Sequence, residues 1–154
     1  MKQHFHRGFS LIELMITLLI LAILSLVVVP GFQSLISHNR LTSTTNQLLG
    51  SLQLARSEAI QSGDDIKVSA IDNDWNQGWT LQTTASGAAP LRVYDDLPGD
   101  IRISTVKGSA SLTYSAIGAT GSSECFTLAN SAGERSVEVI SSGLAAASEV
   151  SCAP

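Results

Sequence analysis

A single carboxylate, Glu13, stands at the start of a long apolar stretch, and it has the clearest chemical consequence in this chain. The sixteen residues that follow it, 14 to 29, carry no charge. A charged side chain at the centre of a bilayer costs about 2.5–3.5 kcal/mol on insertion scales. No Lys, Arg or His lies within one helical turn of Glu13 on either side. We therefore expect a positive group from outside this helix to neutralise the carboxylate.

The apolar stretch follows a short basic leader that contains Lys2 and Arg7. An ordinary secretory signal would end in an Ala-x-Ala-like cleavage site. Here the chain continues Pro30-Gly31-Phe32 instead, so we expect the stretch to remain as a membrane span. The positive-inside rule then places the leader in the cytoplasm and the C-terminal part across the membrane. The alternative is a plain single-span anchor in which Glu13 is incidental.

Residues 8 to 15, Gly-Phe-Ser-Leu-Ile-Glu-Leu-Met, resemble the prepilin motif of type IV pilins and type II secretion pseudopilins. The resemblance implies that a membrane prepilin peptidase cuts between Gly8 and Phe9 and methylates the new N-terminus of Phe9. It also implies that Glu13 pairs with the free N-terminal amine of a neighbouring subunit. Pro30 matches a family position where the helix bends or loosens during packing, and a proline lacks the N–H of a helical hydrogen bond, which predicts a kink.

Beyond residue 32 the pattern becomes that of an amphipathic helix. Small or apolar residues recur at alternating spacings of four and three, close to a heptad seam; they are Leu41, Thr45, Leu48, Leu52, Ala55 and Ala59. Ser62-Gly63 is a stop signal, with glycine at the residue after the helix. One helix from Phe9 to about Ser62 would be roughly 80 Å long at 1.5 Å per residue.

Two internal motifs resemble the GspH/FimT group of minor pilins and pseudopilins. Residues 54 to 60, Leu-Ala-Arg-Ser-Glu-Ala-Ile, are one, and residues 39 to 48 support it. We interpret Arg56 as structural, in contact with the head domain, whereas solvated helix surface is the alternative for both Arg56 and Glu58. The second motif is Trp-x-x-Gly-Trp, in which we expect Trp75 and Trp79 to cap the apolar face between helix and sheet; the alternative is a ligand-stacking platform.

After residue 64 the period becomes two, which is typical of short strands separated by turns. The predicted strands are Ile66–Ala70, Gly78–Gln82, Leu91–Tyr94, Ile101–Thr105, Ser111–Tyr114, Cys125–Leu128 and Ser136–Ile140. The sequence therefore predicts an α+β pilin-like fold in which a long N-terminal helix packs on an antiparallel β-rich head. The expected segments are a leader (1–8), a transmembrane or filament-core helix (9–31), an amphipathic helix (32–63) and a periplasmic head (64–154).

Charge and cysteine content limit the possible partners. The formal net charge is −4, and removal of the leader leaves seven basic and 13 acidic side chains, a net of −6. This balance disfavours nucleic acid as a partner. In an oxidising periplasm the two cysteines, Cys125 and Cys152, are expected to form a disulfide rather than stay as free thiols. A zinc site is disfavoured because His38 is the one histidine that remains beyond the leader.

We expect neither enzymatic activity nor a cofactor. A catalytic triad needs a histidine beside its nucleophile, and His38 lies on the helix near the membrane. Asp72-Asn73-Asp74 is interpreted as a turn rather than a calcium loop, because no bidentate glutamate follows at loop spacing.

Three functions fit these patterns to different degrees. The leading hypothesis is a minor pilin that primes or caps a type IV pilus, with the inner membrane, the prepilin peptidase and other pilins as partners. The alternative is the equivalent pseudopilin of a type II secretion system. A DNA-uptake pilin is the third, but the Gly-Arg-x-Arg element that some FimT-type pilins use corresponds here to residues 142 to 146, Ser-Gly-Leu-Ala-Ala, which contain the glycine and neither arginine.

Overall fold

The computed structural model describes residues 9–85, 87–150 and 152, with the side chains of 27–30 left aside. The chain divides into two compact units, Met1–Ile36 and Ser37–Pro154. One α-helix, α1 (Leu11–Ser62), contributes to both units. It ends where the sequence predicts: Gly63 has a φ of 72°, and its N–H donates to the Ala59 carbonyl at 3.0 Å. Glycine adopts this left-handed conformation without the steric penalty that a Cβ atom would add.

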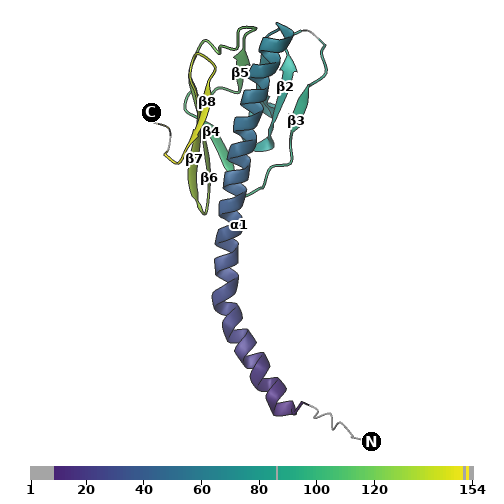
Figure 1. Cartoon of the computed structure of the whole chain (residues 1–154), viewed down its shortest axis with the longest axis vertical. Coiled ribbons are helices and arrows are strands. Elements are labelled where there is room, and N and C mark those ends of the chain that lie inside the picture. Colours follow the sequence, from purple (N-terminus) through teal and green to yellow (C-terminus); the bar gives the residue numbers. More distant parts are fainter. Residues whose placement is uncertain (1–8, 86, 151, 153–154) are drawn as a thin grey trace, which may run out of the picture. The chain divides into compact units, whose positions relative to one another are not determined.

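The second unit contains two antiparallel four-stranded sheets (Figure 1). Sheet A has the order β3-β2-β1-β5, and sheet B has the order β4-β6-β7-β8. The strands are β1 (Ile66–Ala70), β2 (Trp79–Thr83), β3 (Arg92–Tyr94), β4 (Arg102–Thr105), β5 (Ser111–Tyr114), β6 (Glu124–Asn130), β7 (Gly133–Val139) and β8 (Ala145–Ser148). Two short 3-10 helices, η1 (Ile71–Asn73) and η2 (Trp75–Gln77), lie between β1 and β2.

The C-terminal half of α1 supplies one face of the core of the second unit. Every member of the predicted seam is buried, from Leu41 to Ala59, as are Thr44 and Ser51 on the same side of the helix. Figure 1 shows β2 and β3 to one side of this half and β6, β7 and β8 to the other. The prediction of an amphipathic helix on a β-rich head is confirmed.

The predicted strands are present: β1 and β5 have the predicted bounds, and the ends of the others differ by at most three residues, but β8 was missed. Its sequence, Ala-Ala-Ala-Ser, has low β propensity and no apolar alternation. It forms because the chain turns back at Gly143, whose φ is 82°, so that β8 pairs with β7 from Val139 opposite Ala145 to Ser136 opposite Ser148. Seven predicted strands therefore become eight in the described part of the chain.

The predicted disulfide between Cys125 and Cys152 is confirmed. It joins β6 to the tail that follows β8, across 27 residues. The tail is also held by a bond from the Ser136 hydroxyl to the Val150 carbonyl at 2.5 Å and by an ion pair between Arg135 and Glu149 at 3.0 Å. These contacts fix Glu149, Val150 and Cys152 against strands β6 and β7.

Candidate functional site

The N-terminal end of the described chain presents Phe9 and Glu13. Gly8, and with it the predicted cleavage bond, lies outside the described residues. Phe9 is exposed, and Glu13 lies in the first turn of α1, also exposed. The N–H of Leu14 donates to the Ser10 carbonyl at 3.1 Å, so helical hydrogen bonding has begun at this point. A carboxylate at a helix N-terminus is favourably placed in the field of the helix dipole.

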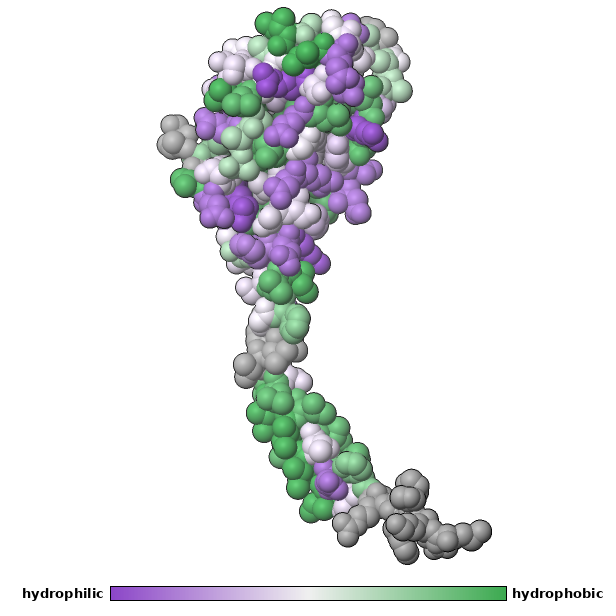
Figure 2. Space-filling model, in the orientation of Figure 1, coloured by the Kyte–Doolittle hydropathy of each residue, from purple (hydrophilic) through white to green (hydrophobic). Residues whose placement is uncertain are grey.

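Residues 9 to 26, which are helical from Leu11 onward, present a surface that is almost continuously apolar (Figure 2). All of their side chains are exposed, including Leu11, Ile12 and Leu26. The two hydroxyl groups in the apolar run are satisfied within the helix. Thr17 donates to the Leu14 carbonyl at 2.8 Å, and Ser25 donates to the Leu21 carbonyl at 2.7 Å. Glu13 is thus the sole ionisable side chain among residues 9 to 26.

By length and composition α1 could cross a membrane; its most apolar 18-residue window has a mean hydropathy of 2.9 and none of that window is buried. Fully burying one large aliphatic side chain contributes about 1.5–3 kcal/mol. An exposed apolar helix of this length therefore favours lipid or the apolar core of an assembly by tens of kcal/mol, roughly.

The Trp-x-x-Gly-Trp motif joins the two sheets of the second unit. Trp79 is fully buried on β2, stacks on Tyr94 with a centroid distance of 5.4 Å, and donates from Nε1 to the Ser51 hydroxyl of α1 at 2.8 Å. Trp75 makes an edge contact with Phe126 of sheet B at 4.8 Å. Trp79 thus connects sheet A to α1, and Trp75 contacts sheet B.

The residues between the two tryptophans complete this joint. The Asn76 side-chain oxygen accepts from the N–H of Ile103 in β4 at 2.8 Å. Asp74 accepts from the backbone N–H of Asn76 at 2.9 Å, and this bond is the main reason that the pKa of Asp74 lies below its usual value. Gly78 has a φ of 107°, and a Cβ atom there would lie 1.9 Å from the Tyr94 carbonyl oxygen, so a side chain cannot be accommodated.

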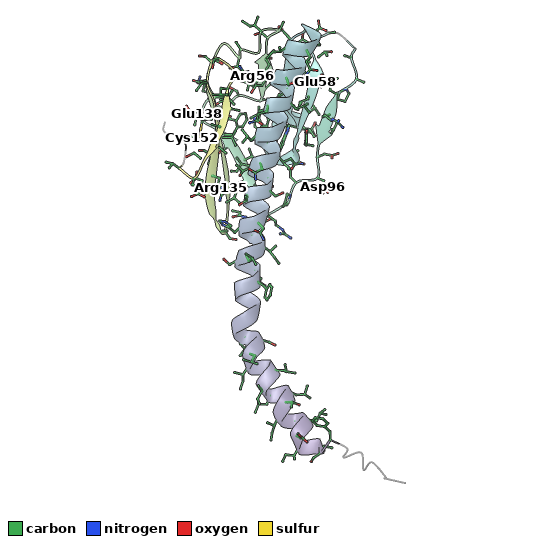
Figure 3. All side chains as sticks on the ribbon, viewed as in Figure 1. Arg56, Glu58, Asp96, Arg135, Glu138 and Cys152 are labelled. Carbon is green, nitrogen blue, oxygen red and sulfur yellow. A yellow bond between two sulfur atoms is a disulfide. The ribbon has the colours of Figure 1, made fainter. Side chains whose placement is uncertain are left out.

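Arg56 reaches from α1 to the turn after β5. Its Nε donates to the Gly118 carbonyl at 3.1 Å, and Figure 3 shows the residue on the side of α1 toward β8. Gly118 in turn lies against Gly143, where an added Cβ atom would be 1.9 Å from the Gly118 oxygen. Arg56 thus holds the point where the β5–β6 and β7–β8 turns meet.

Tyr114 lies beneath this contact. Its side chain is fully buried, and its hydroxyl has no hydrogen-bond partner among the described residues. Burial raises the pKa of Tyr114 to about 12, although the nearby positive charge of Arg56 acts in the opposite direction. The phenol is therefore kept neutral through the physiological range.

Glu58 does not share the site of Arg56. Two residues along a helix correspond to a rotation of about 200°, so the two side chains leave α1 on different sides. Figure 3 shows Glu58 across the helix from Arg56. It is half-buried, and its carboxylate makes no ion pair within the described residues.

Two other segments, considered above as a calcium loop and as a DNA-binding element, form turns. Asp72 and Asn73 have positive φ angles of 51° and 61° and shape η1 rather than an extended loop. No group of three His, Cys, Asp or Glu side chains that could hold a metal occurs within residues 9–85, 87–150 and 152. The segment Ser142–Ala146 forms the β7–β8 turn and the start of β8. Arg135 lies toward the other end of β7 and forms an ion pair with Glu149.

Sequence reasoning missed several residues that build the head. Ser51, Asn76, Tyr114 and Gly143 form contacts between elements that are far apart in sequence, and no sequence pattern identifies their partners. The glycines carried the one usable signal, since an isolated glycine between strands marks a turn or a close backbone approach.

Comparisons with known proteins identify two matching family descriptions and a related protein. The family described as type II transport protein GspH matches residues 44–144, and the prokaryotic N-terminal methylation motif matches residues 4–29. A curated fimbrial protein of Pseudomonas aeruginosa is 30% identical over 109 residues, which cover 68% of this chain and 70% of that protein.

Solved structures share the fold. The type IV minor pilin FimU of Pseudomonas aeruginosa (strain PAO1) superposes with a TM-score of 0.65 at 28% identity, covering 71% of this chain and 89% of that one. The minor pseudopilin EpsH from the type 2 secretion system of Vibrio cholerae superposes with a TM-score of 0.56, covering 70% of this chain and 95% of that one. At 15% identity the likeness to EpsH is one of fold alone.

The environment of Tyr114 generates a pH prediction. Because its pKa is raised from 10 to about 12, the folded state holds the phenolic proton more tightly than the unfolded state. The resulting stability, about 2–3 kcal/mol, is fully present below pH 10 and is lost as the pH rises through 12. We expect Tyr114→Phe to have nearly wild-type stability at pH 7, since the hydroxyl is unpartnered, and to lose less stability between pH 9 and 11.

Thermal unfolding of the purified chain at pH 7, 9, 10 and 11 tests this, with Tyr94→Phe as the matched control for removal of a phenol. Equal alkaline losses in wild type and Tyr114→Phe would show that another group controls the transition.

Proposed function

The chain belongs to the family of the type II transport protein GspH, and from that premise we propose that it is a minor pilin of a type IV pilus. The observation that carries the proposal is an exposed apolar helix with one carboxylate in its first turn, on a fold whose similar structures include a type IV minor pilin. Such a helix is stable in a bilayer and in the apolar core of a fibre, and Glu13 supplies a charge that has to be matched in both.

We infer that the subunit is processed before assembly. The prepilin peptidase would cut after Gly8 and release a free amine on Phe9, which it would then methylate. This step removes Lys2 and Arg7 and leaves an N-terminal cation four residues before Glu13. The agreement of the N-terminal methylation motif with residues 4–29 supports this assignment.

Glu13 then sets the register of the subunit in the fibre. At low dielectric an unpaired carboxylate is costly, so the subunit leaves the bilayer most readily where a neighbour's N-terminal amine can meet it. The same pairing also neutralises the positive charge of the neighbour's N-terminal amine. Pro30, with its missing N–H, would let the helix adjust as it packs among the other helices.

The two ends of the chain then occupy different places. Residues 9–31 form the inner-membrane span and later the fibre core, residues 32–63 carry the amphipathic seam, and residues 64–154 form a head in the periplasm. The head is built as a scaffold for contacts with other pilins: its joint at Trp75 and Trp79 is filled by protein, and we assign it no catalytic role.

A second candidate is the corresponding minor pseudopilin of a type II secretion system. The description of the matching family favours it, and the fold of EpsH is consistent with it. The 28% identity to FimU, against 15% to EpsH, supports the pilus as the primary proposal.

Deletion of the gene separates these two machines. For a minor pilin we expect loss of twitching motility and of surface fibres, with secretion of hydrolases unchanged, and restoration of both by the wild-type gene. Normal fibres together with hydrolases trapped in the periplasm would assign the chain to the secretion system instead.

Substitution of Glu13 tests the assembly mechanism. We expect Glu13→Gln to be processed normally but to appear in sheared fibres at least tenfold less than wild type, because loss of the charge abolishes the pairing; an effect of about 1.4 kcal/mol suffices for this ratio. Glu13→Asp should be impaired less.

The matched control is Thr17→Val, one turn further along α1, where the hydroxyl bonds only to its own helix. It should assemble like wild type. Normal incorporation of Glu13→Gln would contradict the pairing mechanism.

A further inference from the structure

Strand β8 leaves backbone groups free at the end of sheet B. The N–H of Ile140 donates to the Leu144 carbonyl at 3.0 Å, which fixes the alternation of the β7–β8 ladder. In an antiparallel ladder the hydrogen-bonded pairs alternate with non-bonded ones. Ala146 and Ser148 therefore bond to β7, whereas the N–H and C=O groups of Ala145 and Ala147 are directed away from it, toward the open edge.

This edge lacks the devices that usually protect an edge strand, which include charged side chains, proline and coverage by other elements. Among the strands that end the two sheets, β3 contains Arg92 and β4 contains Arg102, while no residue of β5 is exposed. Only β8 in the described chain combines uncharged small side chains with exposure of three of its four residues. Its exposed side chains are no larger than serine, so another strand could approach closely.

A groove of about 220 Å³ lies between this strand and α1. Gln53, Arg56, Ser57 and Ile60 line it from the helix, and Gly143, Leu144 and Ala145 line it from the β7–β8 turn and the start of β8. Ile60 and Leu144 are each about half exposed, at 52% and 56%. The groove therefore offers apolar contacts beside the free backbone groups.

Arg56 gives the groove a positive charge. Its Nε is used by the Gly118 carbonyl, but Nη1 and Nη2 make no hydrogen bond or ion pair within the described residues. Because Nε is anchored, the guanidinium is held in place at the groove with donors that match a carboxylate. This is a second role for Arg56, separate from its contact with the turn.

We propose that the groove binds an extended segment of a neighbouring pilin-class subunit, which adds as a strand to β8 and places a carboxylate against Arg56. The inference rests on the proposed function, since it requires that such subunits surround the chain. Strand addition to an exposed edge gives affinity through main-chain hydrogen bonds and specificity through side-chain pockets. The acidic group required of the partner is either an Asp or Glu side chain or a C-terminal carboxylate.

The strand has to come from another chain. The segment that follows β8 in this subunit is tied to β6 by the Cys125–Cys152 disulfide and to β7 by the Ser136–Val150 bond. These ties hold Val150 and Cys152 on strands β6 and β7, away from the open edge of β8.

Site-specific photo-cross-linking in cells that express the full chain tests the inference, with Leu144→p-benzoylphenylalanine as the probe. We expect an adduct in sheared fibres whose mass-spectrometric map lies in an extended segment of another pilin-class subunit. Adding Ala147→Pro should reduce the adduct at least tenfold, because proline removes an outward N–H that β7 does not use. Ala147→Ser is the matched control and should leave the adduct unchanged.

The charge is tested in the same way. Arg56→Gln retains an N–H donor for Gly118 but loses the positive charge, and we expect at least a threefold weaker adduct, whereas Gln53→Ala on the same groove wall should have less effect. Val93→p-benzoylphenylalanine on β3 serves as a reference position that Ala147→Pro should not affect.

The outcomes separate the inference from the proposed function. Fibres that contain the subunit but give no adduct at residue 144, an adduct that maps to a helix, or one that survives Ala147→Pro would overturn strand addition and leave the pilin assignment intact. A chain that is processed but never enters fibres would overturn both.

Discussion

The constraint on which the structure depends is an apolar helical surface that carries one carboxylate. Residues 9 to 26 expose their side chains, and Glu13 is the sole ionisable group among them. Exposing this apolar surface to water is unfavourable, and so is placing an unpaired Glu13 carboxylate in lipid or in a fibre core. The two requirements are met together when apolar helices pack side by side and a cation from a neighbour reaches the carboxylate. We therefore interpret the anchor as an assembly element whose charge specifies the register.

In the second unit the rest of the same helix packs against the two sheets. The buried seam from Leu41 to Ala59 gives the sheets a common core. The Trp75–Trp79 motif contacts sheet B through Phe126, sheet A through Tyr94 and α1 through Ser51. Arg56 adds a contact at the turns after β5 and β7. These interactions leave the interior filled and place the available interaction surfaces at the edges, of which β8 is the most open.

Periodicity and local turn chemistry predicted much of this arrangement. The four-and-three spacing identified the buried face of α1, Gly63 marked its end, and alternation located seven strands close to their observed positions. Strand β8 could not be predicted, because Ala-Ala-Ala-Ser pairs with β7 only after Gly143 has turned the chain. The Arg56–Gly118 and Asn76–Ile103 contacts were also beyond the sequence, since residues 62 and 27 positions apart meet only in the folded sheets. The processing bond at Gly8 rests on the family motif and lies outside the described residues.

The measurement that tests the account most directly is the mass of the membrane-extracted chain from cells with and without the prepilin peptidase. The account predicts a mature chain that begins at Phe9 with a methylated amine, and an unprocessed chain from Met1 when the peptidase is absent. An intact Met1 in both strains, or a cut beyond Val29, would contradict it, because the cation proposed to pair with a neighbour's Glu13 would never be formed at the end of the apolar helix.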